Sequence, residues 1–198
     1  MKKFIRYSLA ALLGLICGLL LFFPWTTLAG TISSLAATAA AENGIYLTVG
    51  SSRAEGILFK KFSYSAINAD FPVLRGSLRE LTVAPSFISS LFSDEKSARL
   101  TFGRGSVVPV TRQELNWNAG AADVILKAES LLVENISFTG ESSLSGFAEL
   151  SRSDFRIIRA NLLVKVPAEL DRMLEMMQKT NMIPLTKVKS GEWRIERK

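Results

Sequence analysis

The stretch LLVKVP at residues 162–167 is the clearest indication of the fold. Leu162, Val164 and Val166 are apolar at every second position, and the charged Lys165 lies between the last two. A period of two places successive side chains on opposite faces of a strand, so this stretch predicts a β-strand with one apolar face. Pro167 ends the run. The same period recurs from residue 45 onward, which predicts a mainly β fold.

About nine strands are predicted in all. In the first two, the apolar positions are Ile45, Leu47 and Val49, and then Phe62, Tyr64 and Ala66 alternating with serines. Further strands are predicted at residues 78–83, 100–102, 107–110, 136–138, 145–150, 155–166 and 191–195. Residues 121–133 fit a helix approximately and a strand equally well, and we favour the strand because Ile136 and Phe138 continue a period of two. The segment Gly103-Arg104-Gly105 separates two runs and predicts a hairpin turn.

Two short helices are predicted within this β-rich region. Pro85 begins the first, an apolar stretch over residues 85–92. The second follows Pro167, with Glu169 and Asp171 in its first turn, where the helix dipole favours acids. Its apolar residues recur at helical spacing: Leu170, Met173, Leu174 and Met177. We expect this helix to plug the sheet, with a lid or a partner-docking face as the alternative role.

The N-terminal region predicts a membrane anchor. Lys2, Lys3 and Arg6 precede an apolar run over residues 7–23, and no further charge occurs before Glu42. At a rise of about 1.5 Å per residue, this run covers most of a bilayer core of roughly 30 Å, and the stretch from Phe4 through Trp25 crosses it comfortably. The basic flank places the N-terminus in the cytoplasm and the rest of the chain in a periplasm or its equivalent. The predicted anchor residues are Tyr7, Leu13, Leu20, Phe23 and Trp25.

A cleaved signal peptide is the alternative, because the segment AAA at residues 39–41 offers small residues of the type that signal peptidase recognises. The apolar run is longer than the usual signal-peptide core and ends far before this site, so we favour an uncleaved anchor. Leu28 and Ile32 at helical spacing predict a helix that ends at Asn43-Gly44. The predicted parts are the basic end and anchor (1–25), a connecting helix (26–42) and a single periplasmic β-rich domain (43–198).

The composition excludes most catalytic chemistry. The 198-residue chain has no histidine, and its one cysteine, Cys17, lies in the apolar run. These facts exclude Ser-His-Asp and Cys-His sites, zinc or iron–sulfur ligation by cysteine, and disulfides. We therefore predict no enzyme activity, no metal and no cofactor. Half of the formal net charge of +6 comes from Lys2, Lys3 and Arg6. Nucleic acid is not expected as a partner, because the domain is predicted to lie across the membrane from it.

Four segments, taken in order, carry a family resemblance. They are FPW at residues 23–25 leading to Asn43-Gly44, VAPS at 83–86 before an apolar stretch, FGRGSV at 102–107, and the helix 169–179 followed by GEWRI at 191–195. This order resembles type II secretion system protein N and the periplasmic proteins of the AsmA-like superfamily. The resemblance implies a curved, mostly antiparallel sheet folded over like a taco, with two or three short helices and an apolar inner groove.

The resemblance also implies a function. In the secretion branch, the protein is a non-enzymatic accessory component of the export apparatus in the bacterial inner membrane; in the superfamily, such grooves are associated with lipid handling. We therefore expect an accessory secretion subunit, with a lipid-binding or lipid-transfer module as the alternative and a released soluble β-domain as a third. The predicted partners are the lipid bilayer, phospholipid and other secretion-system subunits. The candidate groove or core-face residues are Phe62, Tyr64, Phe102, Leu162, Val164, Met173, Met177 and Trp193.

Overall fold

The computed structural model describes residues 11–15, 17–18, 23–42, 44–56, 61–71, 74–86, 95–109, 114–153, 156–179 and 185–197. Helix α2 spans Trp25–Glu42 and helix α4 spans Ala168–Lys179. The strands are β1 (Tyr46–Glu55), β2 (Lys61–Phe71), β3 (Leu74–Pro85), β4 (Lys96–Phe102), β5 (Gly105–Pro109), β6 (Leu115–Leu126), β7 (Ser130–Gly140), β8 (Ser143–Ser151), β9 (Ile157–Lys165), β10 (Leu185–Lys189) and β11 (Glu192–Arg197).

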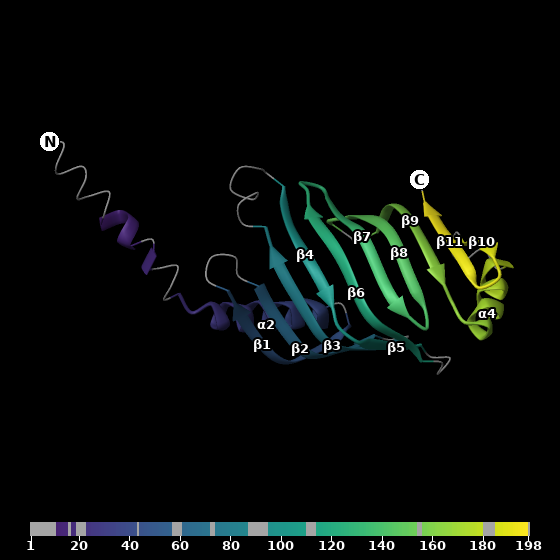
Figure 1. The fold of residues 1–198 in the computed structure, drawn as a ribbon, viewed down its shortest axis with the longest axis horizontal. Helices are drawn as coiled ribbons and strands as arrows, with labels where there is room; N and C mark the ends of the chain where they lie inside the picture. The colour runs from purple at the N-terminus through teal and green to yellow at the C-terminus, as the bar shows by residue number, and fades with distance from the viewer. Residues whose placement is uncertain are drawn as a thin grey trace.

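All of these strands belong to one antiparallel sheet, shown in Figure 1. Its order is β1-β2-β3-β4-β6-β7-β8-β9-β11-β10, and β5 pairs with β3 and β6. The prediction of a mainly β, antiparallel fold is therefore confirmed, with eleven strands among the described residues where the sequence indicated about nine. The ambiguous residues 121–133 form the end of β6, a tight connection and the start of β7, so the strand interpretation of this stretch was correct.

The predicted hairpin at Gly103-Arg104-Gly105 is wrong, because β4 and β5 run in the same direction. Leu81 of β3 pairs with Phe102 and Leu78 pairs with Gly105, so one register continues past the glycines. The Gly103 amide still donates to the Glu80 carbonyl at 2.8 Å. Together, β4 and β5 thus fill a single line between β3 and β6.

The glycines in this line make room for an aromatic ring. Trp117 of β6 pairs directly with Gly105, and a Cβ built at Gly105 would lie 2.3 Å from its Cζ2 atom. The Trp117 Nε1 donates to the Gly103 carbonyl at 3.1 Å. A local glycine pattern that is typical of a turn therefore reflects packing against a ring from the neighbouring strand.

The alternation of β2 shifts by one residue in the middle of the strand. Ala66 has a positive φ of 50° and is exposed, so its predicted place on the apolar face beside Tyr64 is wrong. Ile67 takes that place and packs against the same core as Tyr64. On β3, the consecutive residues Arg79 and Glu80 are both exposed, which marks the same shift there. The face of the sheet that carries Phe62, Tyr64 and Ile67 is called the inner face below, and it remains apolar on both sides of this shift.

Helix α2 covers the inner face at the β1–β3 end of the sheet (Figure 1). The buried residues there are Ala29 of α2 and Phe62 and Tyr64 of β2. Leu28, Val83 and other partly buried apolar side chains surround them. The small Ala29 side chain is fully buried, because α2 meets the sheet at this point. The apolar spacing predicted this helix, and its end before Asn43-Gly44 agrees with the turn signal.

Helix α4 lies at the opposite end of the sheet, beside β10 and β11 (Figure 1). Trp193 of β11 is 0% exposed, and its Nε1 donates to Asp171 of α4 at 2.7 Å. Because Trp193 pairs with Val164 of β9, this helix covers the same face of the sheet as the Val164 side chain. The described helices α2 and α4 therefore cover the two ends of the sheet.

Two predictions concern parts of the chain that are only partly described. Among the described residues, no helix is both long and apolar enough to cross a membrane. Of the predicted anchor residues, Tyr7 and Leu20 lie outside the described residues. The predicted helix at 85–92 is wrong at its first residue, because Pro85 is the last residue of β3. Its remainder beyond Ser86 lies outside the described residues.

Candidate functional site

An apolar groove of about 650 Å³ occupies the middle of the inner face. Ile67 belongs both to the core beneath α2 and to the groove lining, so the groove continues the face that α2 covers. Strands β2 and β11, which lie near opposite ends of the sheet, both contribute to it, so the sheet must curl. Its main apolar lining residues are Ile67, Leu78, Phe102, Val107, Leu115, Trp117, Phe138, Leu144, Leu162, Val164 and Ile195.

Three aromatic rings form the floor of this groove. The ring centroid of Phe138 lies 5.0 Å from that of Phe102 and 5.8 Å from that of Trp117, with the second pair edge to face. Such geometry is favourable for aromatic pairs. Phe138 pairs directly with Gly120, and a Cβ at that glycine would lie 2.4 Å from the ring. Gly120 therefore lets the Phe138 ring lie flat across the neighbouring strand.

The described lining of the groove suits an apolar group. None of the described residues that line it is charged, and its polar members are Ser77, Asn116, Ser142 and Ser143. The Ser142 Oγ atom is buried and has no hydrogen-bond partner within the described residues. The groove volume of about 650 Å³ falls within the range of about 300–1,000 Å³ that is common for small-molecule sites. No group of three acidic or cysteine residues that could hold a metal occurs in the described part of the chain.

The residues singled out from the sequence fall into three places. Phe102, Leu162 and Val164 line the groove. Phe62 and Tyr64 lie instead in the core beneath α2, and Trp193 lies beneath α4. Met173 and Met177 belong to α4, but their side chains lie outside the described part. Among the predicted anchor residues, Leu13 and Phe23 are 54% and 41% exposed, and Trp25 packs beside the α2 core.

Sequence reasoning missed Trp117 and Phe138, which form most of the groove floor. Trp117 lies between two asparagines, so no alternating apolar run marks it. Phe138 was predicted in a strand, but nothing local distinguishes it from other strand residues. The available signal was the pair of glycines, Gly105 and Gly120, each of which lies opposite one of these rings. That signal requires knowledge of the strand register.

The outer face of the sheet is polar and is stabilised by ion pairs. Arg99 donates to Asp123 from two nitrogens at 2.8 and 3.2 Å, and Asn135 donates to the same carboxylate at 2.9 Å. These hydrogen bonds, that from Arg99 above all, hold the pKa of Asp123 below its ordinary value. Strand β8 is joined to β7 by a further contact, in which Ser130 of β7 donates to Glu149 of β8 at 2.8 Å. This contact and the nearby cations lower the pKa of Glu149.

Helix α4 is held to the sheet by a second charged network. Asp171 accepts hydrogen bonds from Lys187 of β10 at 2.9 Å and from Trp193 of β11 at 2.7 Å. Lys187 also contacts Glu175. The hydrogen bond from Lys187, followed by that from Trp193, lowers the pKa of Asp171. Lys189 of β10 also forms an ion pair, with Glu192 of β11 at 3.0 Å. Each lysine of β10 therefore pairs with a carboxylate of a neighbouring element.

Comparison with protein families identifies the chain. Residues 2–197 match the family model described as Type II secretion system protein GspN-like, Synergistales. The chain belongs to this family. The match confirms the resemblance to type II secretion system protein N and places this GspN-like protein among the components of that system. Comparison with curated proteins and with solved structures finds no match.

Proposed function

We propose that this GspN-like protein is a non-enzymatic accessory subunit of a type II secretion system, anchored in the inner membrane with its β-domain in the periplasm. The family match over residues 2–197 carries this proposal. The absence of histidine from the sequence and the uncharged lining of the described groove also favour binding over catalysis.

The membrane anchor is part of the proposal and rests on the sequence. The basic residues Lys2, Lys3 and Arg6 before an uncharged run support an N-terminus in the cytoplasm. A reporter that is active only in the periplasm, fused after Lys198, should then be active. The same reporter fused after a chain that lacks residues 1–23 should be inactive, and activity of both fusions would contradict the anchor.

The test of the secretion role is a deletion strain with quantified export of a type II substrate. We expect export to fall, and we expect the full chain to restore it and to copurify with other inner-membrane secretion components after cross-linking. Unchanged export together with no copurified component would refute the role. A Cys17→Ser variant serves as the control for adventitious thiol cross-links, since Cys17 is exposed.

A lipid-binding role is the second candidate, and the apolar groove supports it. The groove is lined by apolar side chains from both ends of the sheet and holds one unpartnered hydroxyl, at Ser142, within the described residues. An exposed apolar surface of this kind marks binding sites for lipids or apolar partners. The polar headgroup of such a lipid would lie outside the groove, because none of the described lining residues carries a charge that could meet it.

Native mass spectrometry of the full-length protein, with lipid extraction of the same sample, distinguishes the two roles. Phospholipid at a stoichiometric level that is lost in Leu162→Asp or Val164→Asp would support the lipid role, provided circular dichroism shows a folded sheet. An intact chain without lipid would favour the structural secretion subunit. A mass that lacks the N-terminal segment would contradict the anchor.

A further inference from the structure

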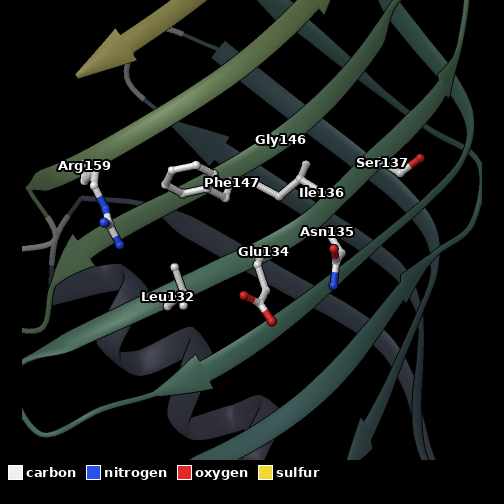
Figure 2. A pocket seen from close by; sticks show the side chains of 8 residues that line it. All are labelled: Leu132, Glu134, Asn135, Ile136, Ser137, Gly146, Phe147 and Arg159. Atoms are coloured by element: carbon white, nitrogen blue, oxygen red, sulfur yellow. The ribbon is translucent and has the colours of Figure 1, made fainter. Parts of the chain in front are cut away.

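The outer face carries a separate hollow of about 650 Å³ over β7, β8 and β9. Figure 2 looks into it from outside, with a helix visible behind the strands, so it lies on the face opposite the groove. Its lining residues are Leu132, Glu134, Asn135, Ile136, Ser137, Gly146, Phe147 and Arg159. None of these residues belongs to the groove site described above.

The hollow arises where the pairing of β7 and β8 is interrupted. The register between these strands shifts between Val133 and Ile136. At this position Asn135 has a φ of 52° and Gly146 has a φ of 134°. A Cβ at Gly146 would lie 2.0 Å from the Asn161 carbonyl oxygen, so only glycine fits there. The interruption separates the neighbouring side chains and leaves Phe147 partly exposed between them.

Each cation in the networks beside the hollow is engaged with a carboxylate other than Glu134. Arg99 binds Asp123, and Arg159 donates to Glu149 at 3.1 Å while lying 5.5 Å from the centre of the Phe147 ring. Lys127 also lies 4.0 Å from Glu149. Glu134 itself is half-buried and has no hydrogen bond or ion pair with any other described residue.

Glu134 also faces a like charge. It pairs directly with Asp123 across β6 and β7, and carboxylates opposite one another in a sheet repel. Asp123 is compensated by Arg99 and Asn135, whereas Glu134 has no such compensation among the described residues. The hollow thus combines an apolar wall, formed by Leu132 and Phe147, with a carboxylate that lacks a counter-charge.

We propose that this hollow receives an arginine or lysine side chain from a partner polypeptide. These side chains have an apolar stem that can pack on Leu132 and Phe147 and a cation that can pair with Glu134. This surface lies on the face opposite the groove, so the proposal is independent of the lipid role and of the membrane anchor.

The experiment is an NMR titration of the isotope-labelled full-length protein in detergent micelles. The probe is N-acetyl-arginine methylamide, and the matched probe is N-acetyl-citrulline methylamide, which has nearly the same shape without the charge. We expect the arginine probe to shift the backbone amides of residues 132–137 and 146–147, with the citrulline probe causing no shift there. Equal shifts with both probes would overturn the proposal.

The variants are Glu134→Gln and, as the control, Glu80→Gln, which removes another carboxylate from the outer face. Glu134→Gln should weaken binding of the arginine probe by about ten-fold or more, and Glu80→Gln should leave it unchanged. Without the probe, Glu134→Gln should also raise the melting temperature, because repulsion with Asp123 is removed. A lower melting temperature, or unchanged binding by this variant, would refute the assigned role of Glu134.

Discussion

Gly120→Ala tests the groove floor directly, because it adds one methyl group beneath an aromatic ring. A Cβ at Gly120 would lie 2.4 Å from Phe138 Cδ1 and 2.5 Å from its Cε1. Carbon atoms in contact prefer separations of about 3.5–4.0 Å, so the ring has to move. Because Phe138 also packs against Phe102 and Trp117, that movement disrupts all three rings.

The expected loss of stability follows from these contacts. Adding a methyl group to a packed site costs about 1–3 kcal/mol, and each weakened aromatic pair costs about 0.5–1.5 kcal/mol. Reduced entropy of the unfolded chain offsets about 0.4–1 kcal/mol of this. We therefore expect Gly120→Ala to lower the free energy of unfolding by about 1–4 kcal/mol. In a domain of this size, each kcal/mol corresponds to about 2–4 °C in melting temperature.

Gly76→Ala is the matched control, because Gly76 also lines the groove but has space beside it. A Cβ there would meet only the Ala69 carbonyl oxygen, at 3.8 Å, so this variant should gain about 0.4–1 kcal/mol. Urea denaturation of the full-length protein in detergent, followed by far-ultraviolet circular dichroism, measures both. If Gly120→Ala is as stable as Gly76→Ala, the Phe138 ring does not lie over Gly120, and the described groove floor is wrong.

Three further predictions use the same measurement. Ala66→Gly should stabilise the protein by up to about 1 kcal/mol, because Ala66 has a positive φ that glycine adopts without strain; destabilisation would contradict that backbone conformation. Trp193→Phe should cost about 1–3 kcal/mol, because it leaves Asp171 without its indole donor; a neutral effect would show that this hydrogen bond contributes nothing. Asp123, Glu149 and Asp171 have lowered pKa values, so their stabilisation is complete above ordinary values of 3.8–4.5 and is lost as the pH falls below them. The urea concentration at the midpoint of unfolding should therefore decrease as the pH is lowered below about 4.5. This decrease should be smaller in Asp171→Asn than in the wild type.

Local periodicity was sufficient to predict most of the strands and helices α2 and α4, because alternation and helical spacing are properties of neighbouring residues. It did not predict β10 or the first half of β6. It could not identify features that depend on residues far apart in the chain. Gly103 and Gly105 look like a turn until Trp117 is known to lie across them. Ala66 fits the apolar alternation of β2, and only the shift on the neighbouring strand accounts for its exposure.

The candidate site was predicted in part for the same reason. Leu162 and Val164 stand out in the sequence because their strand alternates cleanly, and they do line the groove. Trp193 lies on the same face of the sheet, but α4 covers that face at Trp193 and is held there by Asp171 and Lys187. A single sequence shows which face of a strand is apolar, whereas the covering of that face depends on where the helices pack.

Lipid binding in the groove and binding of a partner's cationic side chain in the outer hollow do not compete for the same surface. A lipid in the groove would contact Phe138 from the inner side of β7, whereas a partner side chain would contact Glu134 from the outer side of the same strand. Phe138 and Glu134 lie on either side of the Asn135 irregularity, so a ring displaced from Gly120 would act on the strand that shapes the hollow. Gly120→Ala should therefore be included in the arginine titration: unchanged binding would show that the two faces are energetically independent.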